Sequence, residues 1–309
     1  MSWPDGTPGD PAAALVLAAA ACDVVTSADG VGEVVRQATL RTTLAPGRLV
    51  TGVEATPDPG GLERLIGLRA ASGWRAAART IVPEGLLSPL GLLLDEVPIA
   101  VLLSFYAGLR AGMVGDPVMA QSFSGHMRDL CAGWATGATP MRSLDAGGGV
   151  PMPLLVRVPG EIRDDPLGTE PRPLLAPGRL RRTRRIDVVT GEVHQVHATF
   201  RDSWCDPVDG EGVLHEYVVA AEVDVTGVVI AISAEPRVLP YGECPRAVAA
   251  VQLLVGQHLE STLTSLPDGL TGTSSCTHLN DLLRSLACVP ALAALPSEER
   301  GETKPLRRW

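Results

Sequence analysis

The stretch from Phe200 to Asp224 constrains the fold most, because its composition predicts a pair of antiparallel strands. Val, Tyr, Phe and Trp are frequent at both ends of the stretch, whereas its middle, Asp206–Gly212, is rich in Asp, Pro and Gly. This order is typical of a strand, a turn and a second strand. The sequence therefore predicts a β-hairpin whose turn is centred near Val208 and Asp209.

That turn determines which side chains face one another. It places Asp202 opposite His215 and Phe200 opposite Tyr217. Side chains alternate between the two faces of a strand, so all four lie on one face, and a slip of one residue would separate them. A carboxylate, an imidazole and a phenol, framed by apolar residues, are the components of a general acid–base cluster.

We therefore predict that His215 is the catalytic acid or base and that Asp202 orients its ring. Tyr217 or Glu216 is the predicted second proton donor. Glu216 and Glu222 point to the opposite face in this register, and either replaces a member of the cluster if the register shifts. The alternative interpretation is an ordinary cross-strand ion pair. The predicted substrate-binding residues are Phe200, Tyr241 and Glu222.

The second half of the chain repeats the order of elements in the first half. Residues 18–57 can be aligned with residues 197–236 after a one-residue adjustment, and Asp23 then falls on Asp202. We interpret this agreement as a diverged internal duplication. It predicts a first repeat over residues 1–110, a helix and Pro/Gly-rich linker over 111–178, a second repeat over 179–295 and a polar tail over 296–309.

The duplication also predicts a fold class. Two open antiparallel sheets that are copies of each other lose their exposed edges when they join. We therefore expect a mainly β fold with packed helices (α+β), in which the duplication closes one antiparallel β-barrel of about ten strands.

Composition excludes several classes of protein. The net charge of −9 argues against a nucleic-acid partner, because phosphates require a basic face. The longest apolar run, Leu86–Leu109, is interrupted by two acids and a proline, which argues against a membrane span. Six scattered cysteines without a Cys-x-x-Cys pair favour reduced thiols in a cytoplasm. Whether the chain forms a homo-oligomer is left open by the sequence.

A second polar stretch, Thr271–Leu286, has three interpretations. It is a capped helix with an apolar face, or part of a zinc site in which Cys276 and His278 join Cys244 and another histidine. The third interpretation is a helix start that lowers the pKa of Cys276 and makes it a nucleophile. The capped helix is favoured, because the spacing matches no metal motif. We predict neither a metal nor a cofactor, and the chain has no P-loop, Gly-x-Ser-x-Gly or His-Glu-x-x-His motif.

Several motifs together resemble a bacterial domain-of-unknown-function family, number 2889. They are Phe200–Ser203, His215–Tyr217, Arg237–Pro245 and Gly272–Asp281, supported by Cys131–Trp134. The chain also looks like the stand-alone spiroacetal (spiroketal) cyclases of macrocyclic polyketide biosynthesis. That resemblance implies a barrel of about ten strands whose cavity holds a few acid–base groups.

The resulting hypothesis is a cofactor-independent cyclase that closes a dihydroxy-ketone polyketide into a spiroacetal by acid–base catalysis, as in antibiotic biosynthesis. Its partner is a small-molecule polyketide, with no nucleic acid and no membrane. Two alternatives remain: a non-catalytic barrel that binds a lipid or polyketide, and a thiol enzyme that uses Cys276.

Overall fold

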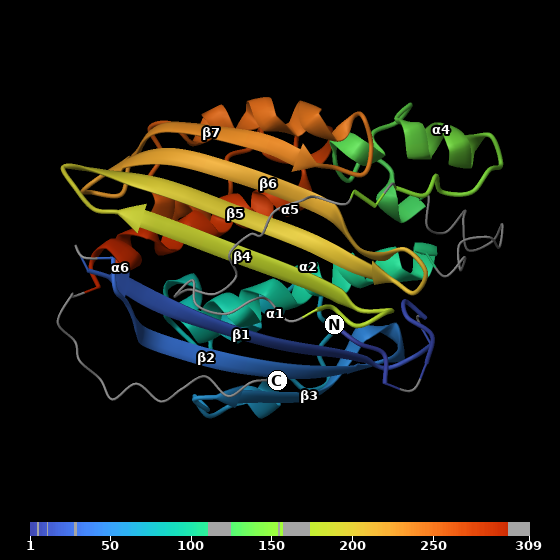
Figure 1. Ribbon diagram of the computed structural model, residues 1–309, viewed down its shortest axis with the longest axis horizontal. Helices are drawn as coiled ribbons and strands as arrows, with labels where there is room; N and C mark the ends of the chain where they lie inside the picture. Colours follow the sequence, from blue (N-terminus) through green and yellow to red (C-terminus); the bar gives the residue numbers. More distant parts are fainter. Residues whose placement is uncertain are drawn as a thin grey trace.

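Two antiparallel sheets form the framework of the protein (Figure 1). The computed structural model describes residues 1–110, 125–156 and 174–295, apart from residues 5, 11, 28, 29 and 154. The first sheet has the order β1-β2-β3, with β1 at Leu15–Thr26, β2 at Gly32–Ala45 and β3 at Leu49–Thr56. The second has the order β4-β5-β6-β7, with β4 at Leu180–Val189, β5 at Val193–Asp206, β6 at Gly210–Asp224 and β7 at Val229–Val238.

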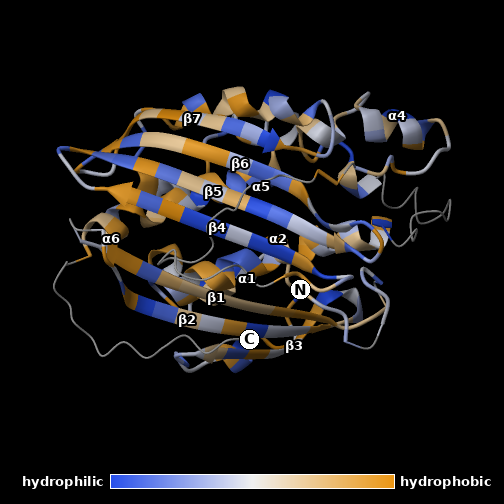
Figure 2. Ribbon diagram, in the orientation of Figure 1, coloured by the Kyte–Doolittle hydropathy of each residue, from blue (hydrophilic) through white to orange (hydrophobic). Residues whose placement is uncertain are grey.

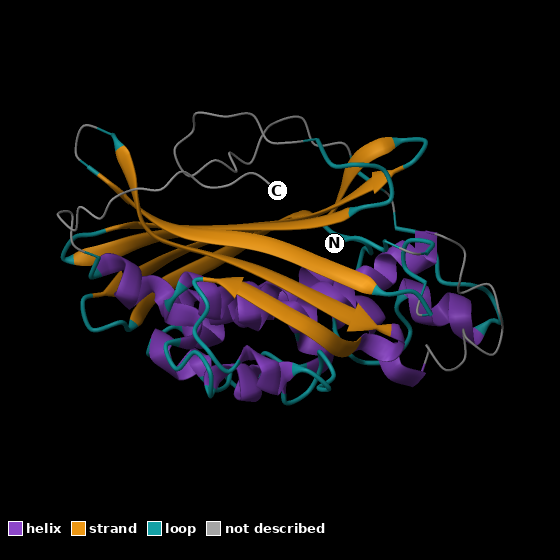
Figure 3. Ribbon diagram, turned by 90° about the horizontal axis from the view of Figure 1, so that it is seen from below, coloured by secondary structure: helices purple, strands orange, loops and turns teal. Residues whose placement is uncertain are grey.

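The helices lie on one side of both sheets, and no described helix covers the other side (Figure 3). The α-helices are α1 (Trp74–Arg79), α2 (Pro89–Arg110), α4 (Thr139–Asp145), α5 (Thr277–Ser285) and α6 (Val289–Ala293). The 3₁₀ helices are η1 (Pro46–Arg48), η2 (Leu62–Leu65), η3 (Gly85–Leu87), η4 (Ala132–Trp134), η5 (Cys244–Leu254), η6 (Leu259–Leu263), η7 (Gly272–Ser274) and η8 (Leu286–Cys288).

Two apolar cores lie between the sheets and the helices, and the first also takes in Leu180, Trp204 and Leu214 of the second sheet. Helix α2 packs against β1 and β2, whereas η5 packs against β7 and α5 against β5. By length and composition α2 is the one described helix that could cross a membrane, but 61% of its most apolar window is buried inside the protein. Figure 2 shows that α2 is largely apolar, whereas the middle of β4 is strongly hydrophilic.

The predicted hairpin is confirmed. Strand β5 ends at Asp206, β6 begins at Gly210, and the chain turns over residues 207–209 between them. Gly210 has a φ of 79°, a conformation that glycine adopts without steric cost. A β-bulge follows the pairing of Asp202 with His215, because Ser203 pairs with Val213. Bulges of this kind re-aim side chains near functional sites.

The expected barrel of about ten strands is wrong. The described strands form two separate sheets of three and four strands, and neither closes on itself. Among the described residues, β1 and β4 share no ladder of hydrogen bonds. The N-terminal residues contact both strands: Ser2 pairs with Val16 of β1, and the terminal amino group of Met1 donates to the Leu180 oxygen of β4. Helices, not further strands, bury the apolar faces, so the sheets gain nothing from closing around an empty interior.

The order of elements is similar in the two halves. A three-stranded meander is followed by 3₁₀ helices and then by an α-helix on the sheet, in residues 15–110 and again in residues 193–285, with β4 added at the edge of the second sheet. The internal duplication itself stays a prediction. Much of the predicted linker, and the tail over residues 296–309, lie outside the described residues.

Buried charges join the two halves. Asp281 of α5 accepts hydrogen bonds from Arg75 of α1 at 2.7 Å, from Arg182 of β4 at 3.2 Å and from Arg184 of β4 at 2.6 Å. Glu96 of α2 lies 2.6 Å from Arg184. Buried charges are tolerated only when they are paired and hydrogen-bonded, so these contacts fix how α1, α2 and α5 lie against β4.

We predict that Asp281→Asn lowers the free energy of unfolding by about 3 kcal/mol or more, because it leaves buried arginines without their shared anion. The substitution keeps the side-chain volume, so the loss reports on charge. Urea-induced unfolding at neutral pH measures it.

Asp187→Asn is the matched control. Asp187 accepts from Arg185 at 2.8 Å, but both side chains are more than 40% exposed. We expect a change below about 1 kcal/mol, as for other surface pairs. Equal losses in the two variants would contradict a structural role for the buried network.

Candidate functional site

The predicted cross-strand pairing brings acid–base groups together. Asp202 pairs with His215, and Phe200 pairs with Tyr217, as expected from the sequence. His215 Nδ1 lies 3.3 Å from Asp202 Oδ2, at ion-pair distance but without the alignment of a hydrogen bond. The pairing is therefore confirmed, whereas the catalytic roles of these residues stay predictions.

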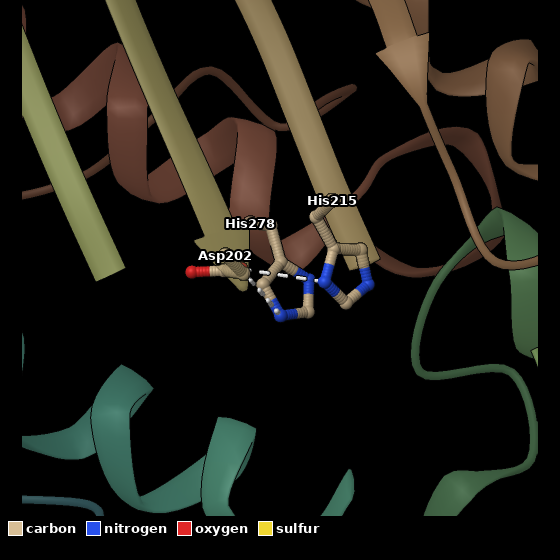
Figure 4. Close-up of side chains that lie close together, drawn as sticks. All are labelled: Asp202, His215 and His278. Atoms are coloured by element: carbon tan, nitrogen blue, oxygen red, sulfur yellow. Dashed lines mark ion pairs between the residues drawn. The ribbon is translucent and has the colours of Figure 1, made fainter. Parts of the chain in front are cut away.

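A second histidine completes the cluster. His278, in the first turn of α5, stacks on His215 with ring centroids 3.9 Å apart and planes 18° apart (Figure 4). His278 Nε2 lies 4.0 Å from Asp202 Oδ2. The side chains of His215 and His278 are 10% and 13% exposed, and that of Asp202 is fully buried. We call His215 and His278 the imidazole pair.

Arg182 holds the carboxylate behind the imidazole pair. Its Nε donates to Asp202 Oδ1 at 2.7 Å and its Nη2 donates to Oδ2 at 2.9 Å, which is a bidentate pair. Burial alone raises the pKa of Asp202. Arg182 and the contact with His215 outweigh that effect, and the net pKa lies well below the usual range. Asp202 is thus an anion whose charge Arg182 balances.

The surroundings of His278 disfavour a positive charge on its ring. Burial lowers the pKa of His278 well below 6.5, and the positive charge of His215 lowers it further, while Asp202 opposes the shift. The positive end of the α5 dipole acts in the same direction as burial. Two imidazolium rings stacked at 3.9 Å would repel each other strongly, so the site disfavours a second positive charge beside the first.

The imidazole pair faces a largely apolar pocket. The pocket has an empty volume of about 720 Å³, which includes its opening to solvent. None of the described lining residues is Lys, Arg, Asp or Glu. Its apolar wall includes Leu103, Phe105, Leu109, Met127, Trp134 and Leu239. Because α2 supplies part of this wall and the second half supplies both histidines, the pocket is formed between the two halves.

Tyr241, a predicted substrate-binding residue, lines this pocket. Its hydroxyl donates to the Pro151 oxygen at 3.1 Å, and the hydroxyl of Tyr106 donates to the Pro153 oxygen at 3.4 Å. The two phenols therefore tie the segment around Pro151 and Pro153 to the pocket, and Pro153 is one of the lining residues.

Tyr217 and Phe200 lie behind the pocket. Both are fully buried, and neither is among its lining residues. The Tyr217 hydroxyl lies against the Cys276 thiol, and burial raises the pKa of Tyr217. Phe200 packs beside His278, with ring centroids 6.4 Å apart. Tyr217 is thus badly placed as a proton donor to a ligand in this pocket, and Phe200 supports the imidazole pair from behind.

Glu216 and Glu222 do not join the cluster, which corrects their assignment to the site. Both alternate to the opposite face of β6 from His215. Glu216 is buried there and accepts from Arg201 at 2.8 Å. Glu222 is exposed and accepts from Gln195 at 3.5 Å.

Three buried cysteines, Cys131, Cys244 and Cys276, also line the pocket. Burial raises the pKa of Cys131 to about 11 and that of Cys244 to about 12. Burial also raises the pKa of Cys276, although backbone N–H groups at the start of α5 oppose the shift. Burial therefore argues against the alternative in which the helix start makes Cys276 a nucleophile, because desolvation exceeds the effect of the helix.

The imidazole pair and Asp202 are donors of the kinds that divalent transition metals take, and their donor atoms lie within 4.8 Å of one another. Their arrangement nevertheless does not suit an ion. Both oxygens of Asp202 already accept from Arg182, whose charge repels a cation. Imidazole lone pairs lie in the ring plane, so two nearly parallel rings do not converge on one metal.

His278 is the residue that sequence reasoning did not place in the acid–base cluster. The sequence suggests for it only the role of a zinc ligand beside Cys276. The available signal was its position at the start of a predicted amphipathic helix, in a stretch rich in polar residues. Nothing local indicates that this helix packs against the Asp202–His215 face of the sheet.

Comparison with known proteins gives one match. Residues 180–291 match a family model described as protein of unknown function (DUF2889). The match extends from the start of β4 into α6, and therefore includes Arg182, Asp202, His215 and His278. No curated protein and no solved structure matches the chain.

The lowered pKa of His278 predicts a pH dependence of stability. The unfolded chain takes up a proton near pH 6.5 that the folded protein does not, so the free energy of unfolding falls as the pH drops below about 6.5. One such proton corresponds to at most about 1.4 kcal/mol per pH unit. We predict that His278→Gln removes this part of the slope, measured by urea unfolding between about pH 7 and pH 5.

The control is His197→Gln, because His197 is exposed in β5, on the face of that strand opposite to Asp202. It should keep the wild-type slope. A wild-type slope in the His278→Gln protein would show that His278 is not held neutral by burial.

Proposed function

We propose that the imidazole pair is the acid–base centre of a cofactor-independent cyclase. Residues 180–291, which match the model of the family DUF2889, include both histidines. The proposed reaction closes a dihydroxy-ketone polyketide into a spiroacetal with loss of one water. The observation that carries the proposal is the stacking of His215 on His278, 3.9 Å apart, at an apolar pocket.

The reaction needs one acid and one base in the same place. A hydroxyl adds to the ketone while a base removes its proton, and an acid protonates the ketone oxygen to give a hemiacetal. The acid then protonates the hemiacetal hydroxyl, water leaves, and the second hydroxyl traps the oxocarbenium ion and gives its proton to the base. A pair of imidazoles that shares one proton supplies both forms at once.

The position of Asp202 assigns the two roles. Its Oδ2 lies nearer to His215 than to His278, at 3.3 Å against 4.0 Å, so the shared proton is better stabilised on His215. His215 is therefore the proposed acid, and His278 the proposed base. The first addition leaves the proton on His278, which then protonates the departing hydroxyl. His215 next accepts the proton of the second hydroxyl, so the pair returns to its starting state without a direct transfer between the stacked rings.

The pocket suits an uncharged, flexible substrate. Its described lining offers apolar and aromatic surface, with no formally charged side chain other than the imidazole pair. Such walls hold a long chain in a folded conformation, and this contributes an entropic part of the rate. The shape of the wall would also determine which face of the oxocarbenium ion is attacked.

We predict that purified protein, with a chelator and no added cofactor, accelerates ring closure of an open dihydroxy-ketone and biases its stereochemistry. His215→Gln and His278→Gln should each lower the rate by about 10²- to 10⁴-fold, because each removes one proton transfer. His197→Gln is the control and should keep the wild-type rate. Chiral chromatography of the product over time measures both rate and bias.

Two outcomes would contradict this proposal. Tight binding of the hydroxyketone without faster closure would favour a non-catalytic binding protein. Loss of activity in the chelator, restored by a divalent metal, would show that the donor atoms of Asp202 and the imidazole pair hold an ion after all.

A separate variant tests the thiol alternative. Cys276→Ala should keep most of the activity, because burial keeps this thiol protonated near neutral pH. Activity is measured in the same assay, with circular dichroism to check folding. A folded but inactive Cys276→Ala protein would favour the thiol enzyme.

A further inference from the structure

We infer that Arg182 is a positioning residue for the imidazole pair, because its guanidinium fixes the Asp202 carboxylate and cancels its charge beside His215 and His278. The inference rests on the proposed function where it concerns activity. The protonation of the imidazole pair, however, can be measured without a substrate.

The geometry of the Arg182 side chain supports this role. It forms a bidentate pair with Asp202, at 2.7 and 2.9 Å, and is only 7% exposed. The guanidinium carbon also lies 4.9 Å from the centre of the Phe200 ring, in a cation–π contact. Phe200 in turn packs beside His278. The planar guanidinium is therefore held by the Asp202 carboxylate at its edge and by the Phe200 ring at its face. A lysine ammonium could not make both contacts in this geometry.

Both halves of the protein hold Arg182 in this position. Its Nη1 lies 3.2 Å from Asp281 of α5 and 3.5 Å from Glu96 of α2. Arg184 is on the same face of β4 and contacts Asp281 and Glu96 as well. No contact between Arg184 and Asp202 is found in the described part of the chain, which makes Arg184 a matched comparison.

Few ionised groups face the imidazole pair. The titratable and charged groups around it, among the described residues, are Asp202, Arg182, Cys276, Cys131, Cys244, Tyr106, Tyr217 and Tyr241. Burial raises the pKa values of these thiols and phenols, so they are neutral near pH 7. Arg182 and Asp202 are therefore the charges that determine how tightly the pair binds a proton.

Replacing Arg182 with an uncharged residue should make the imidazole pair bind protons more tightly. Without Arg182, Asp202 becomes an unbalanced buried anion 3.3 Å from His215. The cluster of carboxylate and imidazoles would then bind protons more tightly. The acid would become weaker, and the neutral base would be populated only at higher pH, so the pH optimum of the reaction would move upward.

The test is a pH titration of the full chain, labelled with ¹⁵N-histidine and followed by NMR. His215→Gln and His278→Gln variants assign the signals. We predict that Arg182→Met raises the pH midpoint of the imidazole pair by about one to two units. Arg184→Met should lose stability too, but keep a midpoint near the wild-type value.

Arg182→Lys covers the case in which Arg182→Met does not fold. An ammonium keeps the charge but contacts fewer carboxylate oxygens, so a smaller upward shift is expected, together with a lower cyclisation rate. The inference is overturned if Arg182→Lys changes neither the pH midpoint of the imidazole pair nor the cyclisation rate. It is also overturned if Arg182→Met and Arg184→Met shift the midpoint equally. Absence of cyclisation in the wild type would overturn the proposed function and leave the titration result standing.

Discussion

The pairing of two arginines in β4 with carboxylates from other elements is the constraint on which the structure depends. Arg182 and Arg184 bring positive charge into the interior, where they meet Asp202 of β5, Asp281 of α5 and Glu96 of α2. A buried ion network adds little net stability over apolar residues, but breaking one partner is costly. Its effect is therefore to select one arrangement of strands and helices, and that arrangement also determines where the pocket lies.

The same network positions the catalytic groups that we propose. His278 and Asp281 are three residues apart in α5, so they lie on one face of the helix. The hydrogen bond from Arg182 to Asp281 therefore also helps to hold His278 against His215. Arg182 then reaches Asp202 on its other side. One guanidinium thus connects the position of the helix to the charge of the acid–base cluster.

Local features of the sequence predicted part of this site, and tertiary contacts decided the rest. The pairing of Asp202 with His215 could be predicted, because a short turn rich in Gly, Pro and Asp determines the register. The position of His278 could not, because it depends on how a helix more than sixty residues later packs on the sheet. The predicted barrel was wrong for a related reason. Composition predicts strands, but it does not show whether the edges of two sheets pair with each other or whether helices cover the faces of the sheets instead. Glu216 and Glu222 belong to the opposite face that the register already implied.

The charge balance of the site suits a reaction that passes through a cation. When an imidazolium protonates a leaving hydroxyl and water departs, the positive charge moves from the ring to the oxocarbenium carbon, and the total charge of the pocket does not change. An apolar wall would destabilise a cation created without such compensation. Asp202 lies within 4.0 Å of both rings and its own charge is balanced by Arg182, so it can stabilise the charge during the transfer without trapping the proton permanently. A free carboxylate in the same position would bind the proton too tightly for the ring to act as the proposed acid, so the proposal depends on the arginine behind the carboxylate as much as on the histidines in front of it.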